Sequence, residues 1–138
     1  LGMSAYAASK GIKGVANWFY GQWKEELEHA KKMFDYVHQS GNRVTLKAID
    51  VPPQDFSSAA DLFEKTLNHE KKVTGLIKNL VDVARSENDK ASEDFLQWFV
   101  KEQVEEEATP ATILKRIQTA GSDTTKFSEV DQQLARRK

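Results

Sequence analysis

The sequence predicts an all-α protein, built as a four-helix bundle with one long crossover and a short fifth C-terminal helix. Two stretches with an apolar period of 3.6 residues, 58–86 and 91–120, are joined by a short polar turn, so we expect them to lie antiparallel. A third periodic stretch, 15–39, precedes a segment over 40–56 that lacks a helical period and contains two consecutive prolines. A connection of that length can run along a whole bundle, so the helices on either side of it can lie parallel.

The first residues have the pattern of a short helical segment. It occupies 1–10, and glycines follow it as stop signals. We interpret this segment as the remnant of a first bundle helix. We therefore expect that the sequence is truncated at its N-terminus, with most of the first helix missing. The next helix ends at Ser40-Gly41-Asn42, where Gly41 suits a left-handed cap.

The later helices have their own start and stop residues. Ser57 and Ser58 offer an N-cap to the helix that follows them, and Gly121 ends the longest helix. The run that begins with Ser128 and Glu129 has the pattern that opens a short last helix. We expect a single domain over 1–138, divided into a first-helix remnant at 1–10, helices at 15–39, 58–86, 91–120 and 128–136, and a crossover at 40–56.

Composition limits the classes of function. The chain has 138 residues, of which 39% are hydrophobic and 30% charged, as in a globular domain with a buried core. Its 20 basic and 21 acidic residues give a net charge of −1, which does not favour a nucleic-acid partner. No apolar run approaches the length of a membrane span, so we expect no membrane partner. The absence of cysteine excludes disulfides and thiolate metal sites and is compatible with the cytoplasm, the location that we expect.

A carboxylate lies in the middle of the apolar face of the first long helix. At 3.6 residues per turn, Glu26 shares a face with five apolar residues. Burying a lone ionised carboxylate costs several kcal/mol. We therefore expect a cation to offset the charge of Glu26, with His29, one turn away, as a neighbouring ligand. The five apolar residues are Val15, Phe19, Ala30, Met33 and Val37.

The other two long helices also place polar groups on their apolar faces. Glu70 lies at the centre of the apolar face of 58–86, and Gln103 lies on that of 91–120, with Glu106 one turn further on. A single glutamate on such a face is more often a surface residue whose long side chain reaches water. Because all three helices carry such a group near their midpoints, we expect one shared site.

The residue types predict that this site binds metal. Carboxylates with one imidazole suit iron or manganese and can also bind zinc, and several carboxylates can neutralise two divalent ions. In helical bundles, such di-iron sites are built from inward-facing glutamates and Glu-x-x-His motifs, as at Glu26 and His29. A lone histidine would more often be a hydrogen-bonded core residue. His38 and His69 lie off these faces, and we expect both to be ordinary polar residues.

Three motifs and part of the crossover carry a resemblance to a known family. The motifs are Trp23–Ala30, Leu67–Val73 and Phe95–Glu107, and the crossover segment is Ala48–Pro53. Together they resemble the bacterial non-haem ferritins, over essentially the whole chain and with the spacing between motifs kept. The resemblance implies the ferritin-like bundle and cytoplasmic iron storage with ferroxidase activity. It also implies oxidation of Fe(II) by oxygen or peroxide, and self-association into a hollow shell of twenty-four subunits around ferric mineral.

The resemblance also implies a role for each inward-facing residue. Glu26 corresponds to the carboxylate that bridges two irons, His29 to the nitrogen ligand of the first iron, and Gln103 to the amide near it. Glu70 and Glu106 correspond to ligands of the second iron. A third iron site is implied as well, formed by the carboxylates of Glu25, Glu102, Glu105 and Glu106.

Related families fit less well. Bacterioferritins and rubrerythrins carry a second Glu-x-x-His, whereas here Val73 follows Glu70 by three residues and Glu106 follows Gln103. The position of the bacterioferritin haem methionine is Glu28 here, so we expect no haem. Smaller ferritin-like shells that protect DNA place their metal site between subunits, and the near-neutral charge of this chain argues against that function.

One iron ligand of the family has no counterpart in the sequence. The family's first helix supplies a glutamate to the first iron, and this sequence begins after the corresponding position. If the truncation is real, we expect impaired iron binding and impaired shell assembly. The alternative function is therefore a non-catalytic helical bundle with an impaired di-iron site and a different oligomeric state.

Overall fold

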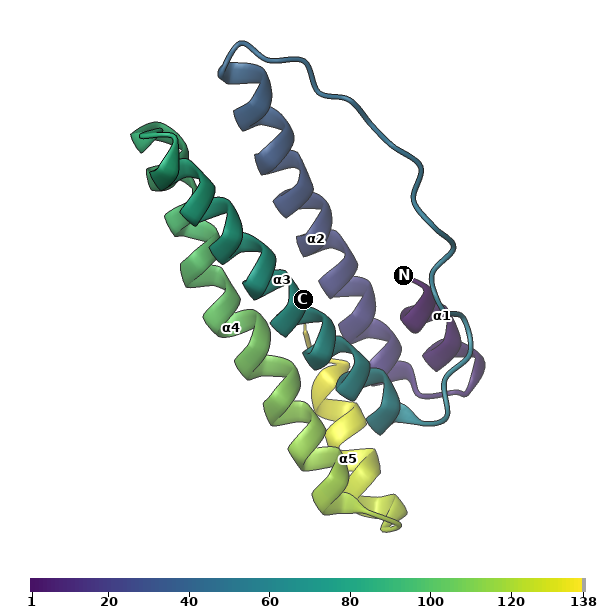
Figure 1. The fold of residues 1–138 in the computed structure, drawn as a ribbon. Helices are drawn as coiled ribbons and strands as arrows, with labels where there is room; N and C mark the ends of the chain where they lie inside the picture. Colours follow the sequence, from purple (N-terminus) through teal and green to yellow (C-terminus); the bar gives the residue numbers. More distant parts are fainter. Residues whose placement is uncertain (138) are drawn as a thin grey trace. The chain divides into compact units, whose positions relative to one another are not determined.

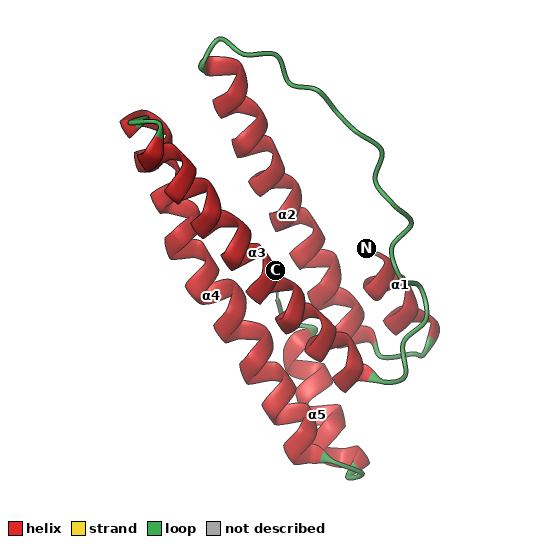
Figure 2. Ribbon diagram, in the orientation of Figure 1, coloured by secondary structure: helices red, strands yellow, loops and turns green. Residues whose placement is uncertain are grey.

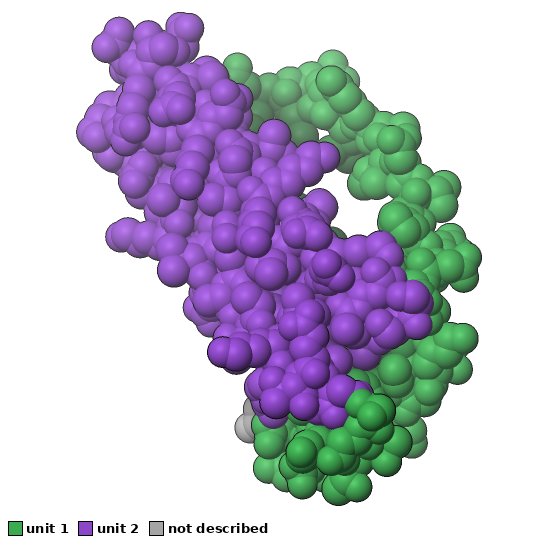
Figure 3. All heavy atoms as spheres, turned by 60° about the horizontal axis from the view of Figure 1, so that its bottom comes forward, with its two compact units in different colours: residues 1–56, 122–138 green, residues 57–121 purple. Residues whose placement is uncertain are grey.

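The computed structural model describes residues 1–137, and in that part of the chain it contains five helices joined by loops and no strand (Figures 1 and 2). The chain divides into two compact units (Figure 3): unit 1 comprises Leu1–Phe56 and Ser122–Lys138, and unit 2 comprises Ser57–Gly121. Among the residues that the structure describes, no helix is both long and apolar enough to cross a membrane. The helices are α1 (Gly2–Ser9), α2 (Lys13–Gln39), α3 (Ala59–Ser86), α4 (Lys90–Ala120) and α5 (Thr124–Leu134).

Unit 2 is a hairpin of two long helices, α3 and α4, which lie side by side (Figure 1). The Ser58 hydroxyl accepts a hydrogen bond from the Asp61 N–H at 3.1 Å and caps the start of α3, as the sequence predicts. Asp89 caps the start of α4 by accepting from the Ser92 N–H at 3.0 Å. The buried apolar residues of unit 2 include Leu62, Phe63, Ile77, Val81, Leu96, Phe99, Ile113, Leu114 and Ile117.

In unit 1, α1 and α5 pack against the first half of α2. The Ser4 hydroxyl donates to the Ala16 carbonyl at 2.8 Å, and the Val15 N–H donates to the Asp131 carboxylate at 2.8 Å. Gly14 permits the close approach of α5, because a Cβ atom at this position would lie 1.7 Å from the Asp131 carbonyl oxygen. The lack of a Cβ atom at Gly14, near the start of α2, therefore allows α5 to pack this closely.

The crossover segment, 42–56, contains neither helix nor strand. Before it, α2 ends at Gln39, and Gly41, two residues later, has a φ of +77°, which matches the predicted left-handed conformation. At its far end, the Phe56 carbonyl accepts a hydrogen bond from the Tyr6 hydroxyl, and the two rings meet edge to face with centroids 5.3 Å apart. Both ends of the crossover are thus tied to helices of unit 1, while Leu46, Ile49 and Val51 between them are exposed.

The start of the last helix differs from the prediction. The sequence pattern placed it at Ser128, whereas α5 begins at Thr124. The Asp123 carboxylate accepts hydrogen bonds from the Thr125 and Lys126 N–H groups at 3.0 and 3.1 Å. The prediction was wrong because this aspartate cap opens the helix before the pattern at Ser128 is reached. The other helix ends lie within two residues of the predicted ones.

Candidate metal centre

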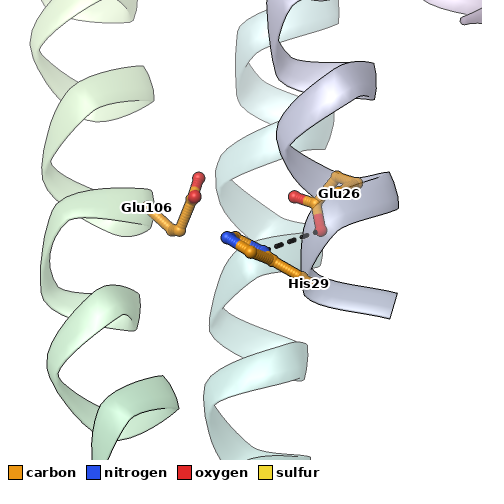
Figure 4. Close-up of side chains that lie close together, drawn as sticks. All are labelled: Glu26, His29 and Glu106. Carbon is orange, nitrogen blue, oxygen red and sulfur yellow. Dashed lines mark ion pairs between the residues drawn. The ribbon is translucent and has the colours of Figure 1, made fainter. Parts of the chain in front are cut away.

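The part of the predicted site on α2 is a carboxylate–imidazole pair. Glu26 and His29 lie one turn apart, and Nδ1 of His29 is 3.3 Å from Oε2 of Glu26 (Figure 4). The other carboxylate oxygen, Oε1, accepts a hydrogen bond at 3.3 Å from Nε2 of Gln22, in the preceding turn. Spacings of three and four residues bring all three side chains to one side of the helix.

The apolar face around Glu26 is not continuously buried, which contradicts the prediction. Val15 and Phe19 are buried, but Ala30 and Val37 are exposed, and the Glu26 side chain is 47% exposed. Within unit 1, α1 and α5 cover the first half of α2, and helical periodicity does not show where that cover ends. The expected cost of burying the Glu26 carboxylate therefore does not arise.

The predicted site residues in unit 2 are buried, as the apolar faces of their helices indicate. Glu70 on α3 and Gln103 and Glu106 on α4 are 6%, 6% and 9% exposed. Nε2 of Gln103 donates to the Glu70 carbonyl at 3.2 Å, to Oε2 of Glu70 at 3.4 Å and to Oγ1 of Thr74 at 3.1 Å. The packing of α3 on α4 thus fixes the Gln103 amide beside the Glu70 carboxylate.

Two further polar residues join this network, although the sequence did not assign them to the site. The Thr74 hydroxyl donates to the Glu107 carboxylate at 2.6 Å and accepts from the Gln103 amide at 3.1 Å. Thr74 lies one turn after Glu70, so the helical spacing that identifies Glu70 could also have identified Thr74. A hydrogen-bonded network therefore extends from Glu70 through Gln103 and Thr74 to Glu107.

The carboxylates expected at a third iron site have different surroundings. Glu25 is exposed and forms an ion pair with Arg137, within unit 1. In unit 2, Glu102 is half-buried and Glu105 is exposed. The sequence could not predict Arg137 as the partner of Glu25, because the two residues are 112 positions apart and no local spacing relates them.

The two other histidines are exposed. The His69 side chain is 69% exposed, and its Nδ1 lies 3.8 Å from Oε1 of the buried Glu70. His38 is exposed near the end of α2. The exposure of both agrees with their interpretation as polar surface residues, and His69 is in addition a neighbour of a candidate ligand.

Comparison with known sequences gives consistent matches. A family model, Ferritin, described as a ferritin-like domain, matches residues 1–120. A bacterial non-heme ferritin of Bacteroides fragilis (strain 638R) is 42% identical over 137 residues, which cover 99% of this chain and 85% of that protein. A bacterial non-heme ferritin of Staphylococcus aureus (strain MRSA252) is 35% identical over 137 residues, which cover 99% of this chain and 82% of that protein.

Comparison with solved structures agrees. An open pore ferritin from the hyperthermophilic archaeon Archaeoglobus fulgidus matches with a TM-score of 0.98 and 43% identity, covering 100% of this chain and 85% of that one. A closed form of the Archaeoglobus fulgidus ferritin, made by site-directed mutagenesis, matches with a TM-score of 0.99 and 43% identity, covering 100% and 84%. This likeness over the whole chain confirms the predicted class, an all-α four-helix bundle with a crossover and a short fifth helix.

Proposed function

Because the chain belongs to the ferritin-like family, we propose that it stores iron and oxidises Fe(II) as a ferroxidase. The observation that carries this proposal is the burial of Glu70, Gln103 and Glu106 inside a hairpin whose other buried residues are mostly apolar. Buried polar groups cost free energy unless they are hydrogen-bonded or bind a cation. A ligand set for iron gives these three residues a chemical role at that position.

In the proposed site, Fe(II) is the substrate, and carboxylates with one imidazole are its ligands. Oxygen and imidazole nitrogen donors suit iron, and Glu26, His29 and Glu106 offer both kinds (Figure 4). We assign Glu26 as the bridging carboxylate, His29 as the nitrogen ligand, Glu70 and Glu106 as ligands of the second iron, and Gln103 as the amide near the first. The assignment of residues from both units to one site rests on the family and on the donor chemistry.

The proposed mechanism divides the work between the substrate and the side chains. Each of two Fe(II) ions held by shared carboxylates gives one electron to the same oxidant, oxygen or peroxide. The carboxylates neutralise the charge of the two ions and set their separation. The Gln103 N–H, 3.4 Å from Oε2 of Glu70, holds that carboxylate in one orientation, as hydrogen bonds to metal ligands commonly do.

Three finer parts of the proposal rest on the resemblance of the motifs. A third iron is held by Glu25, Glu102, Glu105 and Glu106. The chain self-associates into a hollow shell of twenty-four copies that encloses ferric mineral, and it works in the cytoplasm. Haem has no part in this function, because Glu28 stands where a haem-binding relative has methionine.

The substitution Glu26→Ala tests the assignment of the bridging ligand. We expect the loss of rapid Fe(II) oxidation with the fold intact, because Glu26 is exposed and its removal leaves no cavity. Stopped-flow absorbance of ferric product and oxygen consumption measure the rate. Removing a group that merely orients a metal ligand costs about 10–100-fold in activity, so the loss of a ligand should reach at least that range. Glu28→Ala, an exposed carboxylate two residues away, is the matched control. Equal oxidation rates in the two variants would exclude Glu26 as the bridge.

A non-catalytic bundle is the second candidate function. The observation that favours it is the exposure of the Glu25 and Glu26 side chains, 49% and 47%, which also suits ordinary surface charge. Light scattering with and without Fe(II) separates the two functions. A large hollow particle that takes up iron in great excess supports storage, and a small oligomer without uptake supports the non-catalytic bundle.

A further inference from the structure

The residues that follow α5, up to Arg137, dock onto α2 next to the candidate iron ligands. The Arg137 guanidinium lies 4.8 Å from the centroid of the Trp18 ring, donates to the Trp18 carbonyl at 3.3 Å and forms an ion pair with Glu25. Its side chain is only 23% exposed. An arginine held by a ring, a carbonyl and a carboxylate has little freedom to change its position.

Arg137 also reaches Glu26 through one intervening side chain. Nη1 and Nη2 of Arg137 each donate to Oε1 of Gln22 at 3.2 Å. Because a guanidinium can only donate, the oxygen of the Gln22 amide faces Arg137, and its NH₂ group faces the other way. That group donates to Oε1 of Glu26 at 3.3 Å, while His29 lies 3.3 Å from Oε2. Each oxygen of the Glu26 carboxylate therefore has a different neighbour.

We propose that Arg137 is a positioning residue for Glu26: it fixes the Gln22 amide, which in turn fixes the orientation of the Glu26 carboxylate for metal binding. This inference rests on the proposed role of Glu26 as an iron ligand. It goes beyond that role because it makes Arg137, which follows α5 and is more than 100 residues from Gln22 in sequence, part of the support of the proposed metal centre. Outer groups that orient metal ligands typically contribute 10–100-fold to metal affinity.

The chemistry of the contact requires arginine. Gln22 accepts two N–H groups from one planar guanidinium, which also lies over the Trp18 ring. A lysine ammonium is a point charge on a flexible stem and cannot present the same fork of donors. Arg137→Lys should therefore keep the charge near Glu25 but lose the fixed orientation of Gln22.

The docking of α5 also has contacts that do not involve the Arg137 side chain. The Asp131 carboxylate accepts from the Val15 N–H at 2.8 Å, and the Asn17 amide donates to the Leu134 and Ala135 carbonyls at 3.3 and 3.4 Å. We expect these bonds to persist when the Arg137 side chain is replaced. The neighbouring Arg136 is exposed, so Arg136→Gln removes the same charge without touching the relay.

The test measures the binding of Co²⁺, a probe of the Fe(II) ligands that air does not oxidise under the assay conditions. Visible absorption titrations of the full chain compare Arg137→Gln, Arg137→Lys and Gln22→Met with Arg136→Gln. We expect the first three variants to bind Co²⁺ at least about tenfold more weakly than the unsubstituted chain. We expect the affinity of Arg136→Gln to lie within about twofold of that of the unsubstituted chain. The double variant Gln22→Met with Arg137→Gln should bind no more weakly than either single variant, because both remove the same relay.

The outcomes separate this inference from the function on which it rests. If Glu26→Ala binds Co²⁺ as tightly as the unsubstituted chain, then Glu26 is not a ligand and both proposals fail. If Glu26→Ala weakens binding but Arg137→Gln and Arg136→Gln behave alike, only the positioning role fails. Additive losses in the double variant, or full affinity in Gln22→Met, also overturn it. Thermal unfolding of each variant confirms that the chain is folded in the assay.

Discussion

Glu26 of unit 1 lies in an environment opposite to that of three candidate ligands of unit 2. In unit 2, Glu70, Gln103 and Glu106 are buried in the hairpin and fixed by its packing. In unit 1, Glu26 is 47% exposed and is oriented by the relay from Arg137 through Gln22. The difference teaches that similar donor atoms can be positioned in two ways. Ligands fixed by packing are tied to the stability of the fold, whereas ligands fixed by surface hydrogen bonds can be changed at little cost to stability.

The largest expected effect concerns the docking of α5 on α2, the helix that carries the candidate ligands of unit 1. In Gly14→Ala, the new Cβ atom would lie 1.7 Å from the Asp131 carbonyl oxygen, so backbone must move. We expect a loss of about 3 kcal/mol in the free energy of unfolding and faster amide hydrogen exchange in α5. Hydrogen-exchange mass spectrometry measures the local effect, and urea unfolding measures the global one.

Gly75→Ala is the control for that substitution. Gly75 lies in α3, and a Cβ atom there meets nothing within 4 Å. Replacing a glycine inside a helix with alanine should raise the free energy of unfolding by about 0.5–1 kcal/mol. If amide hydrogen exchange in α5 is unchanged in Gly14→Ala, the docking of α5 does not depend on the close approach of Gly14 to Asp131.

A smaller effect separates the buried candidate ligands of unit 2 from the exposed Glu26. In Gln103→Leu, the Glu70 carboxylate and the Thr74 hydroxyl lose the N–H donor that they share. We expect the free energy of unfolding of the metal-free chain to fall by about 2 kcal/mol. Glu26→Gln, in contrast, should change it by less than about 0.5 kcal/mol. Urea unfolding followed by circular dichroism checks both values, and equal losses would remove the distinction between the units.

The smallest expected effect is the dependence of the stability of unit 2 on acid. Three carboxyl groups on α3 and at the start of α4 have a lowered pKa because they are hydrogen-bonded in the folded chain. The main partner is Lys65 for Asp61, Ser92 for Asp89 and Arg85 for Glu93. A lowered folded-state pKa means that the stabilisation is fully present above the unfolded values of 3.8 and 4.5, and that it is lost as the pH falls below them.

Asp89→Asn isolates one of these groups. Asparagine can still cap α4, since its side-chain oxygen accepts the same N–H, but it does not titrate in this range. We expect the melting temperature of this variant to fall less steeply below about pH 4 than that of the unsubstituted chain. A series of thermal melts from neutral pH into this acid range gives the two slopes. Parallel slopes would exclude Asp89 as a source of the acid sensitivity.

Much of the fold follows from local patterns in the sequence. The 3.6-residue period locates the three long helices, and it places Glu70, Gln103 and Glu106 on the faces that prove to be buried. Periodicity succeeds in the hairpin because each helix of unit 2 has a partner along its length. It fails for Glu26, because a period shows which residues share a face but not whether another helix covers that face.

The features that the sequence missed depend on contacts between distant residues. Gln22 is four residues from Glu26, so helical spacing alone could have predicted the contact between them. The role of Gln22 depends on Arg137, however, which is 115 positions away. A tail residue with several basic neighbours in sequence has no local pattern that identifies its partner. Only the folded chain shows that Arg137 donates a hydrogen bond to α2, whereas Arg136 is exposed.

Unit 1 is formed by two segments of the chain that lie on either side of unit 2 in sequence, and this arrangement affects how the chain folds. The bond between Val15 and Asp131 joins residues 116 positions apart, and the entropic cost of closing a loop rises with its length. Unit 2 lies wholly inside that loop and is built from contacts between helices adjacent in sequence. Once the α3–α4 hairpin has formed, its first and last residues lie at the same end of the hairpin (Figure 1), and the loop that remains is much shorter. The insertion of a locally folding unit thus lowers the entropy lost when α5 joins α2.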